Sequence, residues 1–264
     1  MPTVQLGPKI GLILQVVLLA ILAATVGLGV AGWVTGVAFG FITCAALARG
    51  LYRGVGVGDF AKLASETVGT FGPGDWVTMT RATLVGCVAA LTADSFHQRA
   101  RIEVLVTIAV VALVLDAVDG QVARRTGTAS GLGARFDMEV DAFLILVLSV
   151  YVARSMGAWI LAIGAMRYAF VVASWALRWM SGPLPQRFWR KVVAATQGVV
   201  LVFATADVLP APLIIAALAA ALALLVESFG RDIVWLWRHG IVEPHRLDRA
   251  PRRRRQATLR GSAS

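Results

Sequence analysis

Long apolar runs separated by charged residues fill most of this chain, and they constrain its fold more than any other feature. A membrane-spanning helix needs about 20 mostly apolar residues. Runs of this kind occur at about residues 10–28, 32–48, 79–94, 102–118, 136–153, 157–177, 192–208 and 211–230. Hydrophobic residues make up 58% of the 264 residues and charged residues only 15%, a balance far from that of soluble domains. The sequence therefore predicts an all-α integral membrane protein with about eight spans.

The distribution of positive charge predicts how these spans are oriented. The chain has 25 Lys and Arg residues against 15 acidic residues, for a net charge of +10. Most of the basic residues fall on alternate connections and in the C-terminal tail, which by the positive-inside rule places both termini in the cytoplasm. In a membrane protein this bias indicates attraction to anionic headgroups rather than nucleic-acid binding. The expected location is a cytoplasmic membrane of the bacterial type.

The apolar runs and the charged residues between them divide the chain into four segments. Residues 1–50 are expected to form an N-terminal transmembrane hairpin, whose first run is longer than a typical signal-peptide core. Residues 51–78 are polar and Gly-rich, which predicts a cytoplasmic linker with a short surface helix at 59–68. A six-span core is expected at 79–235, followed by a basic tail at 236–264.

Two pairs of aspartates flank one connection of the predicted core. Asp116 and Asp119 lie three residues apart at the end of the fourth run, and Asp137 and Asp141 lie four apart at the start of the fifth. These spacings put each pair on one face of its helix. Because the connection is short, the two helices are expected to be antiparallel neighbours whose carboxylates converge. Ionised carboxylates in a partly dehydrated site repel one another, so a cation is expected among them.

The chemistry of this cluster points to divalent metal ions. Hard cations such as Mg²⁺ or Mn²⁺ take oxygen ligands, and two such ions can clamp the attacking and leaving oxygens of a phosphoryl displacement. Gly120 and Gly133 lack a Cβ and would let a phosphate come close, Ala123 would permit tight helix packing, and Arg124 could contact a phosphate oxygen. The simpler alternative is a solvated loop whose acids are neutralised by neighbouring arginines.

The same segment resembles a known family signature. From Asp116 to Asp141 it reads DxxDGxxAR, eight further residues, then GxxxDxxxD, which is similar to the signature of the CDP-alcohol phosphatidyltransferases. Upstream, "PGDWVTMTR" at 73–81 resembles the family's Pro-x-Asn-x-x-Thr-x-x-Arg segment, with Asp75 where Asn is common. The resemblance covers about residues 70–235.

The resemblance implies a fold, an activity and roles for individual residues. Members of the family are six-helix membrane bundles, commonly homodimers. They transfer a phosphatidyl group from a CDP-linked lipid such as CDP-diacylglycerol to a small alcohol and release CMP, in phospholipid biosynthesis. The implied metal ligands are Asp116, Asp119, Asp137 and Asp141, with Asp141 also the general base on the acceptor hydroxyl. The implied CDP contacts are Gly120, Ala123, Arg124 and Gly133, together with Pro73, Thr78 and Arg81 of the upstream segment.

Basic residues elsewhere are candidates for binding the acceptor. Arg167 lies near the middle of the sixth run, where it either contacts the acceptor or forms a structural ion pair, with Glu227 as one possible partner. Arg187, Arg190 and Lys191 lie on the connection before the seventh run, where the positive-inside rule alone would also explain them. If they bind substrate, a phosphorylated acceptor such as inositol phosphate or glycerol phosphate is favoured over serine or choline.

Two other classes of protein use clustered aspartates in membranes. Intramembrane prenyltransferases act on lipid diphosphates with magnesium, but their aspartate motifs lie on widely separated helices, whereas both pairs here flank one short connection. A cation transporter could use the four acids as its ion site, although such sites are expected near the midplane between repeated halves. Both classes stay open as alternatives.

Overall fold

The structure is a computed structural model, and it describes residues 6–53, 73–99, 101–126, 131–177 and 188–240. Within these ranges every regular element is helical, and there is no strand. The elements are α1 (Leu6–Val26), α2 (Val30–Arg53), α4 (Pro73–Asp94), α5 (Ile102–Thr126), α6 (Gly131–Met156), the 3-10 helix η2 (Ala158–Ile160), α7 (Leu161–Ala176), α8 (Phe188–Ala206) and α9 (Ala211–Gly240). Each predicted apolar run falls on one of the eight α-helices, so the prediction of an all-α chain is confirmed.

The helices have the composition of membrane helices to different degrees. Among the described residues, two helical segments are long and apolar enough to cross a bilayer, Ala158–Ala176 and Ala211–Arg238. Shorter apolar stretches occur in α1 and α2, at Ile10–Val26 and Val30–Ala46. Large apolar side chains are exposed on most helices, as expected of surfaces that face lipid rather than water. These features indicate a membrane protein, and the count of eight spans stays a prediction.

Several helices extend beyond the apolar runs. Helix α4 begins at Pro73 and so includes the last residues of the segment predicted as a linker. Proline suits the first helical position because its fixed φ is already helical and its missing N–H would have no partner there. Helix α5 continues to Thr126, through the first half of the signature. The predicted surface helix at 59–68 and the tail from residue 241 lie outside the described residues.

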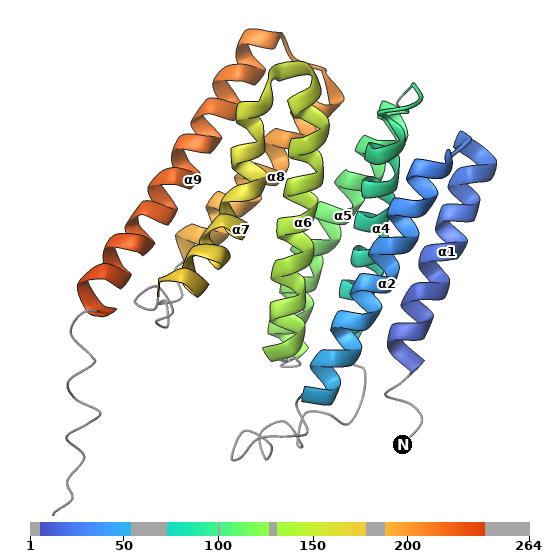
Figure 1. The fold of residues 1–264 in the computed structure, drawn as a ribbon, viewed down its shortest axis with the longest axis horizontal. Coiled ribbons are helices and arrows are strands. Elements are labelled where there is room, and N and C mark those ends of the chain that lie inside the picture. The colour runs from blue at the N-terminus through green and yellow to red at the C-terminus, as the bar shows by residue number, and fades with distance from the viewer. Residues whose placement is uncertain (1–5, 54–72, 100, 127–130, 178–187, 241–264) are drawn as a thin grey trace, which may run out of the picture.

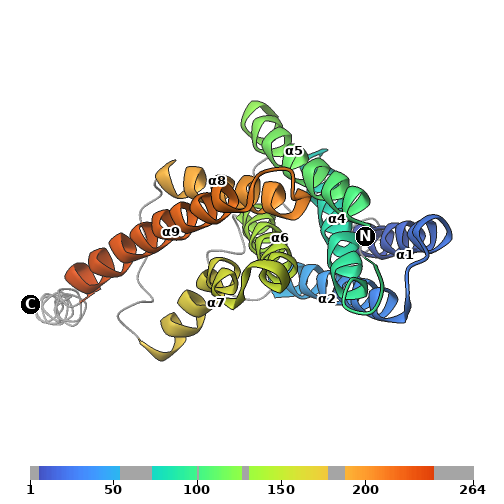
Figure 2. The same ribbon diagram turned by 90° about the horizontal axis from the view of Figure 1, so that it is seen from above.

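The helices alternate in direction and form one elongated bundle (Figures 1 and 2). Helices α1, α2, α4 and α5 occupy one side, α7, α8 and α9 the other, and α6 lies between them. Helix α4 packs against α1, α2, α5 and α6, and α6 also packs against α7 and α8. The start of α1 and the end of α9 lie at the same end of the bundle as the start of α6 (Figure 1). Helices α4 and α6 therefore form the centre around which the others assemble.

Small residues and one carboxylate fasten the N-terminal hairpin to α4. A Cβ added at Gly32 would lie 2.9 Å from the carbonyl oxygen of Ala90, so the backbones of α2 and α4 approach closely there. At the start of α2, the backbone N–H of Gly29 donates a hydrogen bond to the Asp94 carboxylate over 3.0 Å. That carboxylate supplies an acceptor and a negative charge to a helix N-terminus, where both are favourable. The hairpin thus belongs to the packed bundle.

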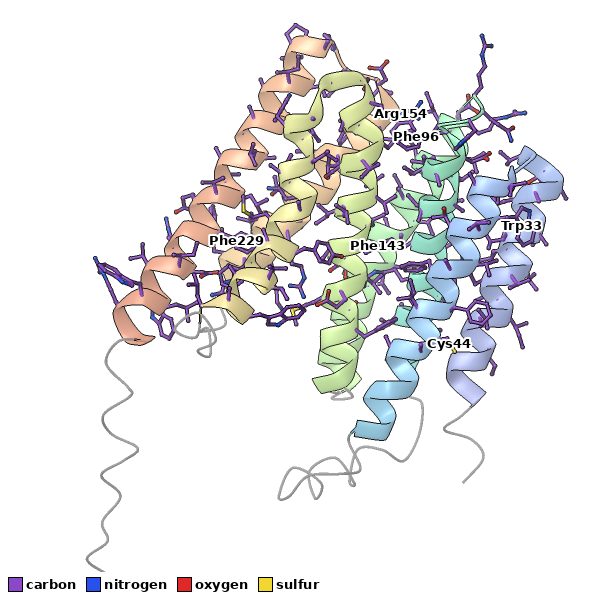
Figure 3. The ribbon with its side chains drawn as sticks, viewed as in Figure 1. Trp33, Cys44, Phe96, Phe143, Arg154 and Phe229 are labelled. Carbon is purple, nitrogen blue, oxygen red and sulfur yellow. The ribbon has the colours of Figure 1, made fainter. Side chains whose placement is uncertain are left out.

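At this same end of α4 an arginine links α6 to the turn that follows α4. Arg154 near the end of α6 donates a hydrogen bond to the Ser95 hydroxyl over 2.5 Å. Its guanidinium also lies 4.6 Å from the centre of the Phe96 ring, a cation–π contact (Figure 3). The predicted functional cluster lies nearer the opposite ends of α4 and α6.

Candidate active site

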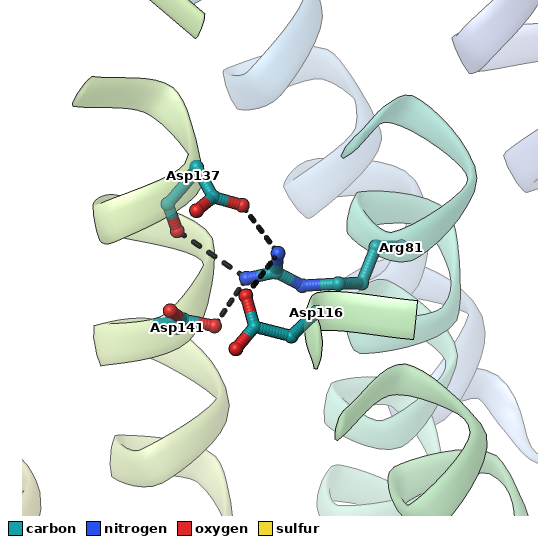
Figure 4. A network of polar contacts seen from close by, with 4 residues as sticks. All are labelled: Arg81, Asp116, Asp137 and Asp141. Atoms are coloured by element: carbon teal, nitrogen blue, oxygen red, sulfur yellow. Dashed lines mark hydrogen bonds and ion pairs between the residues drawn. The ribbon is translucent and has the colours of Figure 1, made fainter. Parts of the chain in front are cut away.

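Three aspartates of the signature meet where α4, α5 and α6 come together (Figure 4). Asp116 comes from α5, and Asp137 and Asp141 come from successive turns of α6. One carboxylate oxygen from each lies within 4.8 Å of the others. The structure therefore brings together three of the four predicted aspartates. The Asp119 side chain lies outside the described residues, although its backbone continues α5.

The cation among these carboxylates is Arg81 of α4. Its side chain is fully buried, and one of its terminal nitrogens, Nη1, lies 2.8 Å from Asp116 Oδ1. The same nitrogen also pairs with the Asp137 carboxylate, and the other terminal nitrogen, Nη2, pairs with Asp141. Nη2 in addition donates to the Asp137 backbone carbonyl over 3.4 Å. The guanidinium thus holds α5 and α6 together through their acids.

Arg81 does not neutralise the cluster completely. One guanidinium against three carboxylates leaves two formal negative charges when all three are ionised. The carboxylates are only partly shielded, because each side chain is about one-third exposed, from 32% to 37%. The arginine Nε is also buried, without a hydrogen-bond acceptor among the described residues. The site therefore retains capacity for further positive charge, and Arg81 leaves one donor unsatisfied.

Helical periodicity and small residues explain why these side chains meet. Ala109 and Ala112 lie on the same face of α5 as Asp116, and both are fully buried. Their small side chains allow α5 to pack closely against its neighbours. Arg81 lies eight residues into α4, about 12 Å from its start at 1.5 Å per residue. The cluster consequently lies inside the bundle, about two to three turns from the helix ends.

The family model for CDP-alcohol phosphatidyltransferases matches residues 74–226, more than half of the chain. The chain belongs to the CDP-alcohol phosphatidyltransferase family. The match extends from α4 into α9 and leaves out α1 and α2. Comparisons with curated proteins and with solved structures gave no match. The family is one of phosphotransferases that use a CDP-alcohol donor and an alcohol acceptor, which supports an enzyme of this kind.

The donor set of the cluster fits a divalent metal ion. Members of the family typically use divalent metals, and Asp116, Asp137 and Asp141 offer only carboxylate oxygens, which hard cations such as Mg²⁺ prefer. The charge left over beside Arg81 also favours a cation. However, Arg81 already contacts one oxygen, Oδ1, of each carboxylate, so an ion that binds these Oδ1 atoms competes with its guanidinium.

The other signature residues can be placed only in part. Thr78 is buried in α4, one turn before Arg81. Pro73 begins that helix, at the end of the bundle where α6 starts. The remaining predicted CDP contacts belong to α5 and α6, but their side chains lie outside the described residues: Gly120, Ala123, Arg124 and Gly133. The roles of these residues toward CDP stay predictions.

Arg167 forms an ion pair, but with a partner other than the one suggested from sequence. Its Nη2 lies 2.5 Å from Glu139 Oε1 on α6. Glu227 instead pairs with Arg231 one turn away and accepts a hydrogen bond from Trp189 over 3.3 Å. The suggestion of Glu227 as the partner of Arg167 is therefore wrong, because α7 packs mainly against α6 and has few contacts with α9. Glu139, which falls between two signature aspartates, has a structural partner.

The remaining acceptor candidates differ in their surroundings. Arg190 of α8 pairs with Asp232 of α9 over 2.7 Å, so its charge already has a partner. Lys191 is exposed, and Arg187 lies outside the described residues. Sequence reasoning missed Asp232 and the pairing of Arg81 with the acids. For Arg81 a signal existed, since a charge deep in an apolar helix needs a partner and the aspartates lie at a similar depth.

Proposed function

We propose that this protein transfers the phosphatidyl group of CDP-diacylglycerol to the hydroxyl of a small alcohol and releases CMP. The observation that carries the proposal is the convergence of Asp116, Asp137 and Asp141 in a chain of the CDP-alcohol phosphatidyltransferase family. The family match gives no support to the prenyltransferase or the cation transporter. The protein is proposed to act in a cytoplasmic membrane as a homodimer, with the site and both termini on the cytoplasmic side.

In the proposed reaction the acceptor oxygen attacks the phosphorus that carries diacylglycerol. A bond forms between that oxygen and phosphorus, while the bond from phosphorus to the bridging oxygen breaks. The bridging oxygen keeps the electron pair and leaves as part of CMP, and the hydroxyl proton passes to Asp141. An alcohol is a weak nucleophile at neutral pH, so a carboxylate within hydrogen-bond reach is needed to take its proton.

The aspartates have a second proposed role, as ligands. Two Mg²⁺ or Mn²⁺ ions held by Asp116, Asp119, Asp137 and Asp141 would neutralise the diphosphate and polarise its P–O bonds. Asp141 lies one turn farther along α6 than Asp137, which suits it to reach the acceptor beside them.

A lipid donor accounts for the position of the cluster. The acyl chains can stay among the apolar helices while the diphosphate reaches the carboxylates, about two to three turns inside the bundle. The candidates to bind a phosphate on the acceptor are Arg167, Arg187, Arg190 and Lys191, and inositol phosphate and glycerol phosphate are the favoured acceptors. The basic tail is proposed to bind anionic headgroups.

Asp141→Asn tests the assignment of the base. The amide cannot take the proton, so we expect transfer to be abolished. Binding of CDP and Mn²⁺ should weaken far less, because three other aspartates still hold the ions. The matched control is Asp207→Asn, because Asp207 lies in the α8–α9 turn at the opposite end of the bundle and has φ +50°, which asparagine tolerates. Radiolabelled CDP-diacylglycerol in detergent, with a panel of alcohols, provides the assay. Near-normal turnover of Asp141→Asn would show that another group is the base.

A further inference from the structure

Arg81 and the expected metal ions depend on the same carboxylates. The guanidinium contacts Asp116, Asp137 and Asp141, which are the three residues whose oxygens converge into the candidate metal group. The Arg81 side chain is fully buried, so these ion pairs belong to the interior of the bundle rather than to its surface. Any cation bound by these oxygens must therefore displace or closely approach the guanidinium.

A guanidinium cannot share this space with a divalent ion. The two cations would repel in a partly dehydrated site, and both would use the Oδ1 atoms of Asp116, Asp137 and Asp141, which Arg81 already contacts. Arginine cannot relieve the conflict by losing its proton, since it stays charged in proteins. An ion that takes these Oδ1 atoms therefore requires the side chain to withdraw. Its unsatisfied Nε and the flexible stem of an arginine are both compatible with a second position.

We infer that Arg81 is an internal counter-ion that competes with divalent cations for the aspartates and, once displaced, binds the diphosphate of the donor. The inference rests on the proposed function, because it assumes that metal ions and a diphosphate both enter this site. It reconciles an expectation with an observation: the resemblance of the upstream motif implies that Arg81 contacts CDP, whereas the structure places it on the carboxylates. A diphosphate offers the paired oxygens that a guanidinium fork binds well. Arg81 thereby offsets part of the repulsion among the acids until an ion takes its place.

Binding of Mn²⁺ alone tests the competition without any turnover. The free Mn²⁺ signal in electron paramagnetic resonance is followed during titration of purified wild-type protein and Arg81→Gln. Removing the competing charge is expected to tighten Mn²⁺ binding by about tenfold. The reason is that Mn²⁺ no longer has to break the ion pairs of Arg81, each of which contributes modestly to the difference in binding free energy. Without Mn²⁺ the variant should unfold at a lower temperature than wild type, and Mn²⁺ should restore more of its stability. Equal or weaker Mn²⁺ binding by Arg81→Gln would overturn the competition.

Binding of CDP in the presence of Mn²⁺ tests the second half of the exchange. Arg81→Gln should bind CDP more weakly than wild type although it binds Mn²⁺ more tightly. A purely structural arginine would not move the two affinities in opposite directions. Unchanged CDP affinity would overturn the transfer of Arg81 to the diphosphate.

Two further variants keep the test decisive. Arg81→Lys retains the charge but loses the fork, so it should bind Mn²⁺ more tightly than wild type, and it serves if Arg81→Gln does not fold. Equal Mn²⁺ affinity in Arg81→Lys and wild type would then contradict the competition. Arg154→Gln is the control for the loss of a membrane-helix arginine, because Arg154 contacts Ser95 and Phe96 instead of the cluster. Lipid transfer by wild type is measured separately. Transfer by wild type without the expected change in Mn²⁺ or CDP affinity would overturn the inference alone, whereas absence of transfer would overturn the proposed function.

Discussion

The contact between α6 and α7 makes a sharp prediction about one glycine. A Cβ added at Gly164 of α7 would lie 2.6 Å from the Cα of Leu146 and 3.0 Å from the Ser149 hydroxyl. The nearer atom belongs to the backbone of α6, so no side-chain rotation can relieve the clash. Ordinary contact begins at 3.4 Å, and Gly164→Ala must therefore separate the two helices by about 0.8 Å at this point.

The magnitude follows from two opposing effects. Overpacking of a tight contact costs about 1–3 kcal/mol. Replacing a helical glycine by alanine recovers about 0.5–1 kcal/mol through helix propensity. We expect Gly164→Ala to be destabilised by about 0.5–2 kcal/mol, and the pair between Arg167 and Glu139 across the same interface to loosen.

Thermal unfolding in detergent measures this effect, with Gly230→Ala of α9 as the matched control. Among the described residues, no atom outside the neighbouring turns of α9 lies within 4 Å of a Cβ added at Gly230, so only the gain in helix propensity, about 0.5–1 kcal/mol, should remain. The predicted order of melting temperatures is Gly230→Ala, wild type, Gly164→Ala. If Gly164→Ala melts at or above wild type, α6 and α7 are not packed as the structure has them.

Two other contacts give predictions of stability. Asp94→Ala removes the hydrogen-bond acceptor at the start of α2 and should lower the free energy of unfolding by about 1 kcal/mol, whereas Asp94→Asn should lower it less. Thermal unfolding measures both effects. Identical melting temperatures of the two variants and wild type would disprove the contact. A double-mutant cycle on Arg167→Gln and Glu139→Gln should give a coupling of about 0.5 kcal/mol, because the pair is partly exposed. The same cycle with Glu227→Gln in place of Glu139→Gln should give no coupling energy. Coupling of Arg167 to Glu227 and not to Glu139 would show that Glu227 is the partner after all.

The sequence predicted the existence of the helices better than their ends. Apolar runs locate the part of a helix that faces lipid, and each of them proved helical. Helix α5, however, continues eight residues past the predicted end at 118, to Thr126, through a polar segment that hydropathy does not register as helix. Helix α9 likewise reaches Gly240, ten residues past the run that ends at 230. Hydropathy detects the part of a helix whose side chains are apolar, and it does not detect polar turns that continue the same helix.

For the site, local spacing was informative and tertiary pairing was not. The intervals within the signature predicted that Asp137 and Asp141 share a helix face, and this depends only on helical periodicity. That Arg81 would reach the acids depends on α4 packing beside both α5 and α6, which no local pattern specifies. The same limit explains the wrong partner predicted for Arg167. That partner was inferred from charge and depth in the membrane, without knowledge of which helix lies beside α7.

Release of CMP from CDP-diacylglycerol is the measurement that tests the central claim most directly. Purified wild-type protein in detergent, supplied with labelled donor, Mg²⁺ or Mn²⁺ and an alcohol panel that includes inositol phosphate and glycerol phosphate, should release one CMP for each labelled phospholipid formed. Release should depend on the acceptor and on the divalent cation. Absence of CMP with every acceptor, or release of pyrophosphate from a prenyl diphosphate instead, would contradict the proposed reaction.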